Sequence, residues 1–584
     1  MSTTSGGKLM ARMLEAEGVD TLFGIIDGTY LHLFAHAVER GMRLVTPRHE
    51  TSALHMAGAY ARLSGKLGVA LASNGPGVAN ALPGVAVEQS EGNRVLLLTS
   101  SRRSGISYPD RGGAYQCFDQ TAVIRPMAKW SESAQHFARI PELLRQALRV
   151  SFQGRPGLVH LDVAEDLING EGEDAYPLQS PEQYRRTRPL PPDPAQVERA
   201  AAMLAEAELP LIHAGSGVIH AGAFAELERL AGLLGCPVTT SWSARGVLAE
   251  SSPLAYPMVH IELCNQVRRR ADVALCLGAR LGETDWWGKP PYWPQPAEQP
   301  LIQVDIDEAA LGRNRPAALA VQADIKLFLQ ALIAALEARD RPVDTAARKP
   351  ALEELAAARA AARQELEDSL ADMAAPMFTG HVAAVCRRVF ADDAVAVFDG
   401  GNTAVWANTY HRALAPNTQL GTWHMGHLGA GPGQALGAAV ARPQAQVYCI
   451  LGDGALGFHP QEIATAVRIG ARVIFVVCAD NQWGMVKATE LFAFGAIGDQ
   501  FPNALAEQPH INGDLTPIAW DELARAMGAH GERVADPAEL APALERCLEA
   551  GRCAVVHVDV DPAKHLMAPG LMHFKAMHQE PEGE

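Results

Sequence analysis

The stretch Gly452-Asp453-Gly454 is followed along the chain by an apolar run, Val473-Ile-Phe-Val-Val-Cys478, which leads directly into Asp480-Asn481-Gln482-Trp483-Gly484. This pattern predicts two strands whose carboxyl ends bring Asp453 and Asp480 to one sheet edge, with a helix at about 459–470 between them. Two carboxylates beside glycines can hold a hard divalent cation together with a diphosphate. Ordinary strand-end turns, in which Asp and Gly are common, would also explain this stretch taken alone.

Composition limits the classes of function. The chain has 584 residues, of which 48% are hydrophobic and 20% are charged, and its formal net charge is −16. This length predicts about three domains. Because the chain is acidic and has no long basic run, we expect neither nucleic acid nor an anionic membrane surface as a partner.

The cysteines indicate the compartment. All nine are scattered and none forms a CxxC pair, which is typical of reduced, buried thiols rather than of a disulfide framework. No N-terminal signal peptide and no apolar span of about 18 residues is visible. We therefore expect a cytoplasmic protein without a membrane partner.

Short apolar runs alternate with helix-like segments along the whole chain, for example Thr21–Ile26 and Leu158–Val163. This alternation predicts an α/β protein with three doubly wound parallel-sheet domains. The predicted parts are an N-terminal domain (1–170), a Pro-rich linker, a middle domain (190–340), a helical connector (341–375), a third domain (376–560) and a tail (561–584).

A second motif lies near the start of the chain. Glu50 follows a strand-like run, Leu44-Val-Thr46, and opens an Ala/Gly-rich helix, Thr51–Leu63. A glycine-rich loop, Asn74-Gly-Pro-Gly77, comes shortly after, and such glycines allow close backbone approach to a planar ring. Glu50 alone could simply complement the helix dipole. A carboxyl group held in an apolar pocket could also act as a general acid or base.

Together the two motifs and the three α/β units resemble the thiamine diphosphate (ThDP) enzymes, in particular the family that contains acetolactate synthase, benzaldehyde lyase, oxalyl-CoA decarboxylase and 2-hydroxyacyl-CoA lyase. The resemblance covers nearly the whole chain. It implies pyrimidine, middle and diphosphate domains, bound ThDP and Mg²⁺, and a site shared between subunits of a homodimer or homotetramer. The chain departs from the pattern at Asp480, where the family has a ligand Asn, and at Ala479 before it.

The resemblance assigns roles to residues of this chain. Glu50 would hydrogen-bond N1′ of the aminopyrimidine and promote the imino tautomer that removes the thiazolium C2 proton. The Gly426 carbonyl would accept from the 4′-amino group, and Leu428 would be the apolar wedge that bends the cofactor. The implied metal ligands are Asp453, Asp480 and Gln482. The remaining implied cofactor contacts are Gly75, Asn80, Gly401, Asn402, Thr403, Gly454, Ala455, Gln482, Gly484 and Met485.

Substrate-side candidates come from the same comparison. Gln116 follows Tyr115 where acetolactate synthase has Phe-Gln, and we expect it to be catalytic. His424 either faces the substrate or is structural. Glu490, on a helix after the metal motif, either moves a proton or faces solvent. Asp27 and His427 depart from the usual pattern, and their roles are open.

The family fixes a carbanion-equivalent mechanism but not the substrate. The local phrases Phe23–Tyr30 and Arg48–Arg62 look most like bacterial 2-hydroxyacyl-CoA lyases. We therefore predict a lyase that cleaves a 2-hydroxyacyl-CoA to formyl-CoA and a ketone or aldehyde, and that also runs the reverse condensation. The partner would be an acyl-CoA. Loose candidates for its nucleotide are Arg268, Arg269, Arg280 and Arg313, and the tail with Met567, Met572 and Met577 is either a lid or a disordered end.

Three alternatives were weighed against this prediction. The first is an acetolactate synthase-like 2-oxoacid carboligase or decarboxylase. The second is a non-catalytic ThDP-fold protein, against which the presence of Glu50, Asp453 and Asp480 argues. The third is a nicotinamide or flavin oxidoreductase, for which no GxGxxG follows a predicted strand. The acyl group, the size of the oligomer and any nucleotide in the middle domain are left open.

Overall fold

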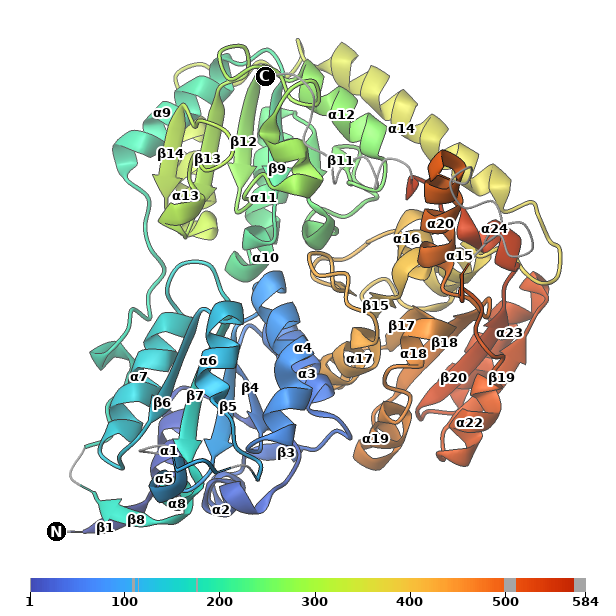
Figure 1. The fold of residues 1–584 in the computed structure, drawn as a ribbon. Helices are drawn as coiled ribbons and strands as arrows, with labels where there is room; N and C mark the ends of the chain where they lie inside the picture. Colours follow the sequence, from blue (N-terminus) through green and yellow to red (C-terminus); the bar gives the residue numbers. More distant parts are fainter. Residues whose placement is uncertain (1, 108–110, 114, 175–176, 498–510, 572–584) are drawn as a thin grey trace.

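A computed structural model of the chain describes residues 2–107, 111–113, 115–174, 177–497 and 511–571, and side chains within these ranges except those of 493–497. Three sheets of six strands each, all parallel, form three α/β domains (Figure 1). A two-stranded antiparallel sheet pairs β1 (Thr3–Ser5) with β8 (Glu171–Glu173). The predicted fold class is confirmed.

The N-terminal domain has the strand order β3-β2-β4-β5-β7-β6. Its strands are β2 (Thr21–Gly24), β3 (Arg43–Val45), β4 (Gly68–Ala72), β5 (Val95–Ser101), β6 (Trp130–Ala134) and β7 (Leu158–Ala164). Its main helices are α1 (Gly6–Ala16), α2 (Leu31–Glu39), α3 (Glu50–Ser64), α4 (Pro76–Glu91), α6 (Gln120–Ile124) and α7 (Arg139–Ser151). The central strands are apolar on both faces because helices cover both sides of a parallel sheet.

The middle domain has the strand order β11-β10-β9-β12-β13-β14. Its strands are β9 (Pro210–Ala214), β10 (Val238–Thr240), β11 (Ala255–Tyr256), β12 (Val273–Leu277), β13 (Leu301–Asp305) and β14 (Leu319–Gln322). Its main helices are α9 (Pro194–Glu206), α10 (Gly217–Ala221), α11 (Phe224–Leu234), α12 (Ile261–Arg270) and α13 (Ile325–Glu337).

The C-terminal domain has the strand order β16-β15-β17-β18-β20-β19. Its strands are β15 (Val395–Asp399), β16 (Gln419–Leu420), β17 (Val447–Gly452), β18 (Val473–Ala479), β19 (His530–Val534) and β20 (Ala554–Asp559). Its helices include α15 (Gly380–Val389), α16 (Gly401–Tyr410), α17 (Ala430–Ala441), α18 (Asp453–Leu456), α19 (Glu462–Ile469), α20 (Gly484–Ile497), α22 (Trp520–Ala526), α23 (Pro537–Glu549) and α24 (Pro562–Leu566).

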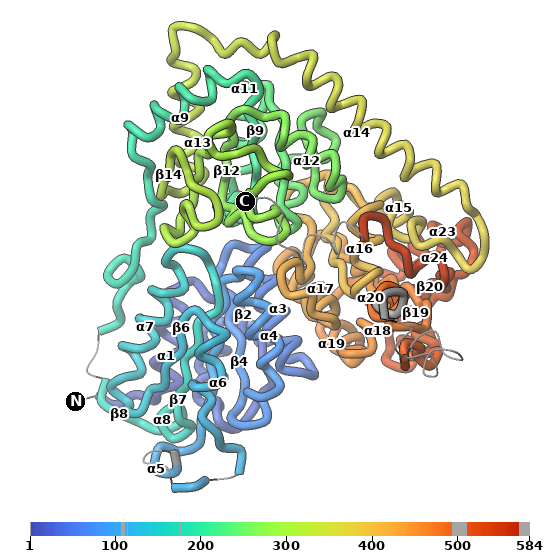
Figure 2. Tube along the Cα trace, turned by 45° about the horizontal axis from the view of Figure 1, so that its top comes forward, coloured from blue at the N-terminus to red at the C-terminus, as the bar shows by residue number. Residues whose placement is uncertain are grey.

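Two connections join the domains. The chain before α9 runs beside the edge strand β14, where Asp324 N donates to Leu190 O over 2.8 Å. The long helix α14 (Lys349–Ser369) leads from the middle domain to the C-terminal domain (Figures 1 and 2). Only Leu355 of this helix is fully buried, so α14 is a solvated connector.

The N-terminal and C-terminal domains pack through α3 and α17 (Figure 1). Glycines on α17 allow the close approach, because a Cβ on Gly437 would lie 2.3 Å from Met56 O. Buried apolar side chains of both domains form one continuous core there. The packing therefore fixes how the two sheets face each other.

Among the described residues, no helix is both long enough and apolar enough to cross a lipid bilayer.

Candidate active site

Asp453 and Asp480 lie at the carboxyl ends of neighbouring strands. Asp453 opens α18 directly after β17, and Asp480 follows β18, which pairs with β17 so that Gly452 is opposite Cys478. Both side chains are buried. The expectation that these two carboxylates share a sheet edge is met by the strand pairing.

The electrostatics of this pair favour a cation. Asp453 accepts from the Gly454 N–H (2.7 Å) and the Asn481 N–H (2.9 Å). Even so, burial and then the nearby charge of Asp480 raise the pKa of Asp453 to about 7. Burial likewise raises the pKa of Asp480 to about 6. A bound divalent cation would stabilise the ionised form of both buried carboxyl groups.

Gln482 already uses its side chain elsewhere. Its Nε2 donates to Asp480 (3.0 Å) and to the Pro562 carbonyl (2.8 Å), while its Oε1 accepts from Lys487 Nζ (3.0 Å). Because Lys487 already engages its side-chain oxygen, this arrangement favours the main-chain carbonyl of Gln482 as the metal ligand. Lys487, which no sequence pattern singled out, is buried and also pairs with Asp514.

The first turn of α16 lies next to the segments that carry Asp453 and Asp480. Gly400 has a φ of 96°, which favours glycine, and it leads into Gly401. Asn402 and Thr403 are buried, and Asn402 Oδ1 has no hydrogen-bond partner among the described residues. A Cβ on Gly401 would lie 3.0 Å from Met485 Cβ, so the starts of α16 and α20 touch.

These segments fit a metal-bound diphosphate. Helix N-termini at Gly401 and Gly484 present main-chain N–H groups, Gly452 and Gly454 let the backbone come close, and the Asp pair supplies charge for a cation. No group of three or more His, Cys, Asp or Glu side chains forms a metal site in the described part of the chain. A cation here would therefore need main-chain or phosphate oxygens as further ligands.

The buried carboxyl group of Asp399 holds the end of the loop 422–429 in place. Asp399 accepts from the Gly429 N–H (3.0 Å) and the Gly431 N–H (2.7 Å), and burial raises its pKa to about 6. Gly426 has a φ of 61° and Leu428 is half-buried. The sequence around Asp399 gives no sign of these contacts, because its partners Gly429 and Gly431 come from a later loop.

The orientation of His424 is set by Glu91. The Glu91 carboxylate, buried at the end of α4, accepts from the His424 N–H (2.7 Å) and contacts its Nδ1 (3.0 Å). His427 points instead toward His55, with ring centroids 5.6 Å apart, and burial lowers its pKa to about 4. These contacts connect the loop with the N-terminal domain of the same chain.

Glu50 is buried at the first position of α3. Its Oε2 accepts from Asn80 Nδ2 (3.1 Å), and a Cβ on Gly77 would lie 3.3 Å from its Oε1. Gly75 has a φ of 69°, and a Cβ on it would lie 2.6 Å from Gln116 Cα. The structure therefore brings Glu50, Gly75, Asn80 and Gln116 into one group at the carboxyl edge of the N-terminal sheet.

Asp27 belongs to the same group through a chain of hydrogen bonds. Its Oδ1 accepts from the Thr29 hydroxyl (2.6 Å), which contacts Ser100 Oγ (2.8 Å). Ser100 Oγ in turn accepts from the Asn74 N–H (3.0 Å). These hydrogen bonds hold the Asp27 carboxylate near the glycine-rich loop Asn74–Gly77.

Helix α4 separates Glu50 from His424 within one chain. Glu50 contacts Asn80, near the start of α4, whereas His424 contacts Glu91 at its end. Eleven residues of helix span roughly 17 Å. Across the described residues, no hydrogen bond or ion pair joins Glu50 to Asp453, Asp480 or the loop 422–429. One chain therefore holds two separate groups of predicted site residues.

Glu490 lies on α20, and its Oε2 accepts from the Ile511 N–H (3.1 Å). Met567 in the tail is half exposed, whereas Met572 and Met577 lie outside the described residues. The alternatives stated for Glu490 and for the tail therefore both stand as hypotheses.

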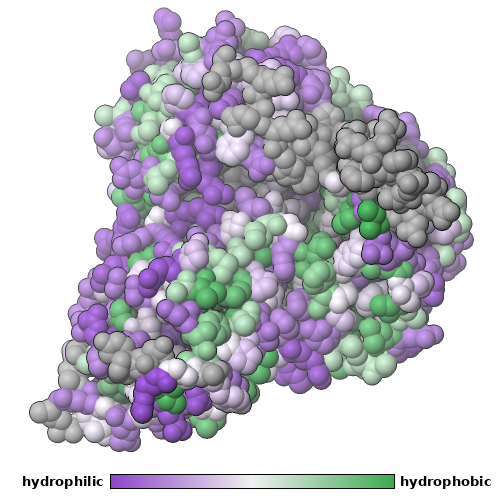
Figure 3. Space-filling model, viewed as in Figure 1, coloured by the Kyte–Doolittle hydropathy of each residue, from purple (hydrophilic) through white to green (hydrophobic). Residues whose placement is uncertain are grey.

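A cavity of about 760 Å³ opens between the N-terminal and middle domains. It lies at the carboxyl ends of the middle strands, reaches the loop at His424–Gly426, and is lined by the cationic side chains of Arg94, Arg155, Arg280 and Arg313. Figure 3 shows hydrophilic side chains in the hollow between these two domains. Acidic residues, Glu283, Asp285, Asp305, Asp307 and Asp324, line the same cavity, so its size and its four arginines allow a phosphorylated ligand without singling one out.

Two of the four arginines proposed for a nucleotide do not line this cavity. Arg268 is fully buried away from the cavity, where it pairs with Asp285 (3.1 Å) and lies over the Trp293 ring. Arg269 pairs with Glu262 on the surface of α12. The run of arginines at 268–270 gives no sign of which side chain turns inward. Arg280 and Arg313 do line the cavity.

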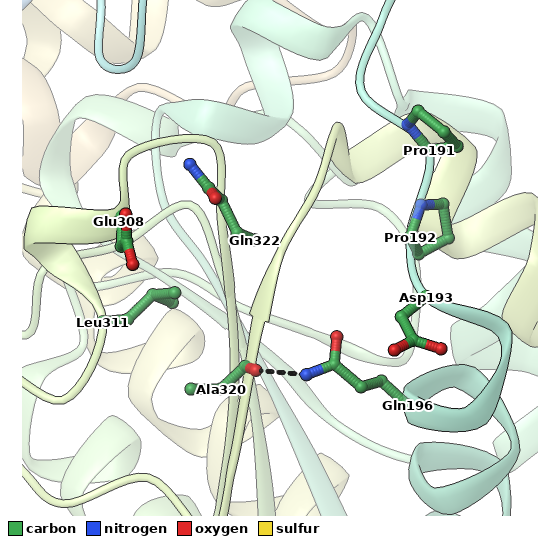
Figure 4. Close-up of a pocket in the computed structure, with 8 residues that line it drawn as sticks. All are labelled: Pro191, Pro192, Asp193, Gln196, Glu308, Leu311, Ala320 and Gln322. Atoms are coloured by element: carbon green, nitrogen blue, oxygen red, sulfur yellow. Dashed lines mark hydrogen bonds between the residues drawn. The ribbon is translucent and has the colours of Figure 1, made fainter.

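Another cavity, of about 730 Å³, lies between the linker and the edge of the middle sheet. Figure 4 shows Pro191, Pro192 and Asp193 on one side and Glu308 and Leu311 on the other, with Gln196 bonded to the Ala320 carbonyl (2.9 Å). Its ionisable lining residues are both acids, and neither belongs to the groups described above. We assign no chemistry to it.

Comparison with known protein families gives three matches along the chain. Residues 4–123 match the N-terminal TPP binding domain of the thiamine pyrophosphate enzymes, residues 197–332 match their central domain, and residues 399–558 match their C-terminal TPP binding domain. The chain belongs to the thiamine pyrophosphate (ThDP) enzyme family.

Full-length relatives are similar over nearly the whole chain. A probable acetolactate synthase of Mycobacterium bovis is 31% identical over 570 residues, which is 96% of each chain. A probable acetolactate synthase large subunit of Methanocaldococcus jannaschii is 28% identical over 568 residues, covering 96% of this chain and 93% of the relative. Acetolactate synthase isozyme 3 large subunit of Escherichia coli is 27% identical over 579 residues, covering 97% and 96%. These names support the carboligase alternative better than the lyase prediction.

Proposed function

We propose that this ThDP enzyme is a carboligase that joins two 2-oxo acids, with the loss of carbon dioxide from one of them. The observation that carries the proposal is the similarity to acetolactate synthases over nearly the full chain, at up to 31% identity among the relatives named above. The buried Asp453–Asp480 pair and the buried Glu50 support it, because both parts of the family's chemistry are present. The simplest product would be acetolactate, formed from two molecules of pyruvate.

The residues divide the work as follows. Bound ThDP supplies a nucleophilic carbon that adds to a carbonyl group and then stabilises the negative charge left by bond cleavage. Asp453, Asp480 and the Gln482 carbonyl would hold Mg²⁺, and the turns at Gly401–Thr403 and Gly454–Ala455 would hold the diphosphate. Glu50 would move a proton at the aminopyrimidine. The Gly426 carbonyl and Leu428 would contact the cofactor, and Gln116 and Asp27 would face the substrate.

We further propose that two copies of the chain complete each site. The separation of Glu50 from His424 by most of α4 supports this, as do apolar side chains left exposed on both groups. These are Ile26, Tyr115 and Phe118 on the N-terminal domain and Met425, Phe458 and Val486 on the C-terminal domain. In Figure 3 apolar side chains reach the surface of both domains. A homodimer or homotetramer would pair one group with the other.

A 2-hydroxyacyl-CoA lyase is the second candidate. The arginine-lined cavity that ends at His424–Gly426 favours it, because a nucleotide could bind there with its acyl arm directed toward the loop. In this reaction the bond between C1 and C2 of the acyl group breaks, and a ketone or aldehyde leaves. The C1 carbon then takes a proton and remains on CoA as formyl-CoA.

Product analysis distinguishes the two reactions. The holoenzyme with ThDP and Mg²⁺ is incubated in separate tubes with pyruvate and with 2-hydroxyisobutyryl-CoA. We expect acetolactate and carbon dioxide in the first tube and intact thioester in the second. Formyl-CoA and acetone in the second tube, with pyruvate unchanged, would contradict the carboligase and establish the lyase. No conversion in either tube would contradict both substrate assignments.

A further inference from the structure

The short helix α24 lies directly against the proposed diphosphate site. It follows β20, is capped by Asp561, and packs on α16 and α20 (Figures 1 and 2). The chain before it is held by Met377, whose N–H donates to Asp559 O and whose carbonyl accepts from the Asp561 N–H, both over 3.0 Å. The helix is therefore anchored independently of any ligand.

Three carbonyl groups of this segment hold side chains of the site. Pro562 O accepts from Gln482 Nε2 (2.8 Å), and Leu566 O accepts from Asn402 Nδ2 (3.1 Å). His565 O accepts from the indole N–H of Trp406 on α16 (2.8 Å). Because both amide groups use their NH₂ on α24, the Asn402 side-chain oxygen is turned away from it and has no partner among the described residues. The helix thus fixes which end of Asn402 faces away from α24.

The His565 ring lies between Thr403 on α16 and Asp480 directly after β18. It is 2% exposed, its Nδ1 contacts the Thr379 hydroxyl (2.8 Å), and its Nε2 faces the Thr403 hydroxyl (3.3 Å). The same Nε2 lies 3.8 Å from Asp480 Oδ2. When Thr379 donates to Nδ1, the proton of a neutral ring sits on Nε2, where it can be donated to Thr403 or Asp480.

We propose that His565 is a positioning residue of the cofactor site, which holds Thr403 and Asp480 in the arrangement that receives the metal and the diphosphate. A phenylalanine would fill the same volume but would leave the Thr379 and Thr403 hydroxyl groups without this partner in a buried place. The polar ring therefore does more than fill space. This proposal depends on membership of the ThDP family and not on the identity of the substrate.

The test measures cofactor binding rather than turnover. His565→Phe removes both ring nitrogens, His565→Gln keeps one donor and one acceptor, and His557→Phe is the control. His557 is a buried histidine of the same domain, bonded to the Trp520 N–H (3.3 Å) and to Asp559. ThDP affinity is titrated at saturating Mg²⁺, and Mg²⁺ affinity at saturating ThDP, by calorimetry, with thermal unfolding of each cofactor-free variant alongside.

We expect His565→Phe to weaken both affinities at least tenfold, His565→Gln to stay within threefold of the unaltered protein, and His557→Phe to leave both unchanged even if it lowers the unfolding temperature. Unchanged affinity in His565→Phe would overturn the proposal. An equal loss in His557→Phe would also overturn it, because general destabilisation would then be the cause.

If His565→Phe does not fold, Thr379→Val decides. This variant keeps the imidazole but removes the hydroxyl that fixes its tautomer, and it touches no proposed cofactor ligand directly. A threefold to tenfold loss of ThDP affinity supports the proposal, and unchanged affinity overturns it. Because neither readout uses a substrate, a failure of the carboligase assignment would not be mistaken for a failure here.

Discussion

The N-terminal and C-terminal domains each present buried acids at the carboxyl edge of a parallel sheet, but they satisfy them differently. In the N-terminal domain Asp162 accepts hydrogen bonds from Thr99 (2.7 Å), Gln120 (2.8 Å) and Ser133 (3.0 Å). In the C-terminal domain Asp453 and Asp480 instead face each other, and Asp480 raises the pKa of Asp453. The Asp162 carboxyl group has its hydrogen-bond donors within the domain and needs no ligand. The Asp453–Asp480 pair, in contrast, would be stabilised by a bound cation.

This difference shows that the buried Asp162 of the N-terminal domain serves stability, whereas the Asp453–Asp480 pair of the C-terminal domain serves ligand binding. The Asp162 network supports the glycine loop, since Gln120 also accepts from the Gly75 N–H (2.8 Å). Satisfied buried polar groups make a region rigid and unique. The Asp453–Asp480 pair costs stability in the cofactor-free protein because two buried carboxyl groups lie close together, and a bound metal would offset that cost. Mutations should therefore separate the two regions.

The largest expected effect is on turnover in Glu50→Gln. General acid–base groups contribute about 10²–10⁴-fold, and we expect a loss in that range with ThDP still bound. Exchange of the thiazolium C2 proton for deuterium, followed by NMR, checks the step directly. Near-normal exchange and turnover would show that Glu50 is only a helix N-terminal acid.

The next effect is on cofactor binding in Asp453→Ala. Loss of a charged ligand should weaken Mg²⁺-dependent ThDP binding by about 100-fold or more, since changes even to supporting groups of metal sites cost about 10–100-fold. Calorimetric titration with and without Mg²⁺ measures it. If ThDP affinity is unchanged, the metal site lies elsewhere.

Stability against pH tests the Asp453–Asp480 pair in a second way. The pKa of Asp453 is raised from 3.8 to about 7, so the folded cofactor-free protein binds more protons than the unfolded chain between these values. Its stability contribution is therefore full below about pH 4 and is lost as the pH rises to about 7. Denaturant unfolding across this range should show a larger loss in the unaltered protein than in Asp453→Asn, which keeps the raised pKa values of Asp399 and Asp480, and Mg²⁺ with ThDP should reduce the difference. Equal pH profiles for the two proteins would mean that the pair is not strained.

A mutation in the Asp162 network should lower stability and leave the metal site unchanged. Asp162→Asn places an NH₂ group among the donors of Thr99, Gln120 and Ser133, which should cost about 1–3 kcal/mol. Denaturant unfolding measures the loss, and Mg²⁺ affinity should stay within about threefold of the unaltered value, since the site is in another domain. A large fall in Mg²⁺ affinity without a change in stability would reverse the comparison.

The smallest effect concerns the glycine loop. A Cβ on Gly77 would lie 2.7 Å from Ser73 Oγ and 3.3 Å from Glu50 Oε1, so Gly77→Ala should displace the carboxyl group slightly. We expect about a tenfold lower turnover with unchanged ThDP affinity. Gly105→Ala, where a Cβ would meet nothing within 4 Å, is the matched control. Equal effects in both variants would show that the close approach of Gly77 to Glu50 is not needed for turnover.

Local patterns predicted the fold and the main parts of the site. The apolar runs gave β17 and β18, and the glycine and Asp signals placed Asp453, Asp480 and Glu50 at the ends of elements. The predicted helix at 459–470 is α19, which begins a little later, at Glu462. Such features depend on neighbours in the sequence, so a sequence can reveal them.

Features that depend on distant partners were missed. The strand β6, Trp130–Ala134, is rich in polar residues because Ser131 bonds His160 in the interior, so no apolar run marks it. Glu91 and His565 acquire their roles only from residues far along the chain. Arg268 was placed at a nucleotide because the sequence does not show that it pairs with Asp285.

The most direct test of this account asks whether the two groups complement each other between chains. Glu50→Gln and Asp453→Ala chains are co-expressed with different tags, and the mixed dimer is purified through both. One of its two sites would combine Glu50 from one chain with Asp453 from the other, so we predict about half of the unaltered turnover per dimer. A mixed dimer no more active than its two inactive parents would contradict the shared site.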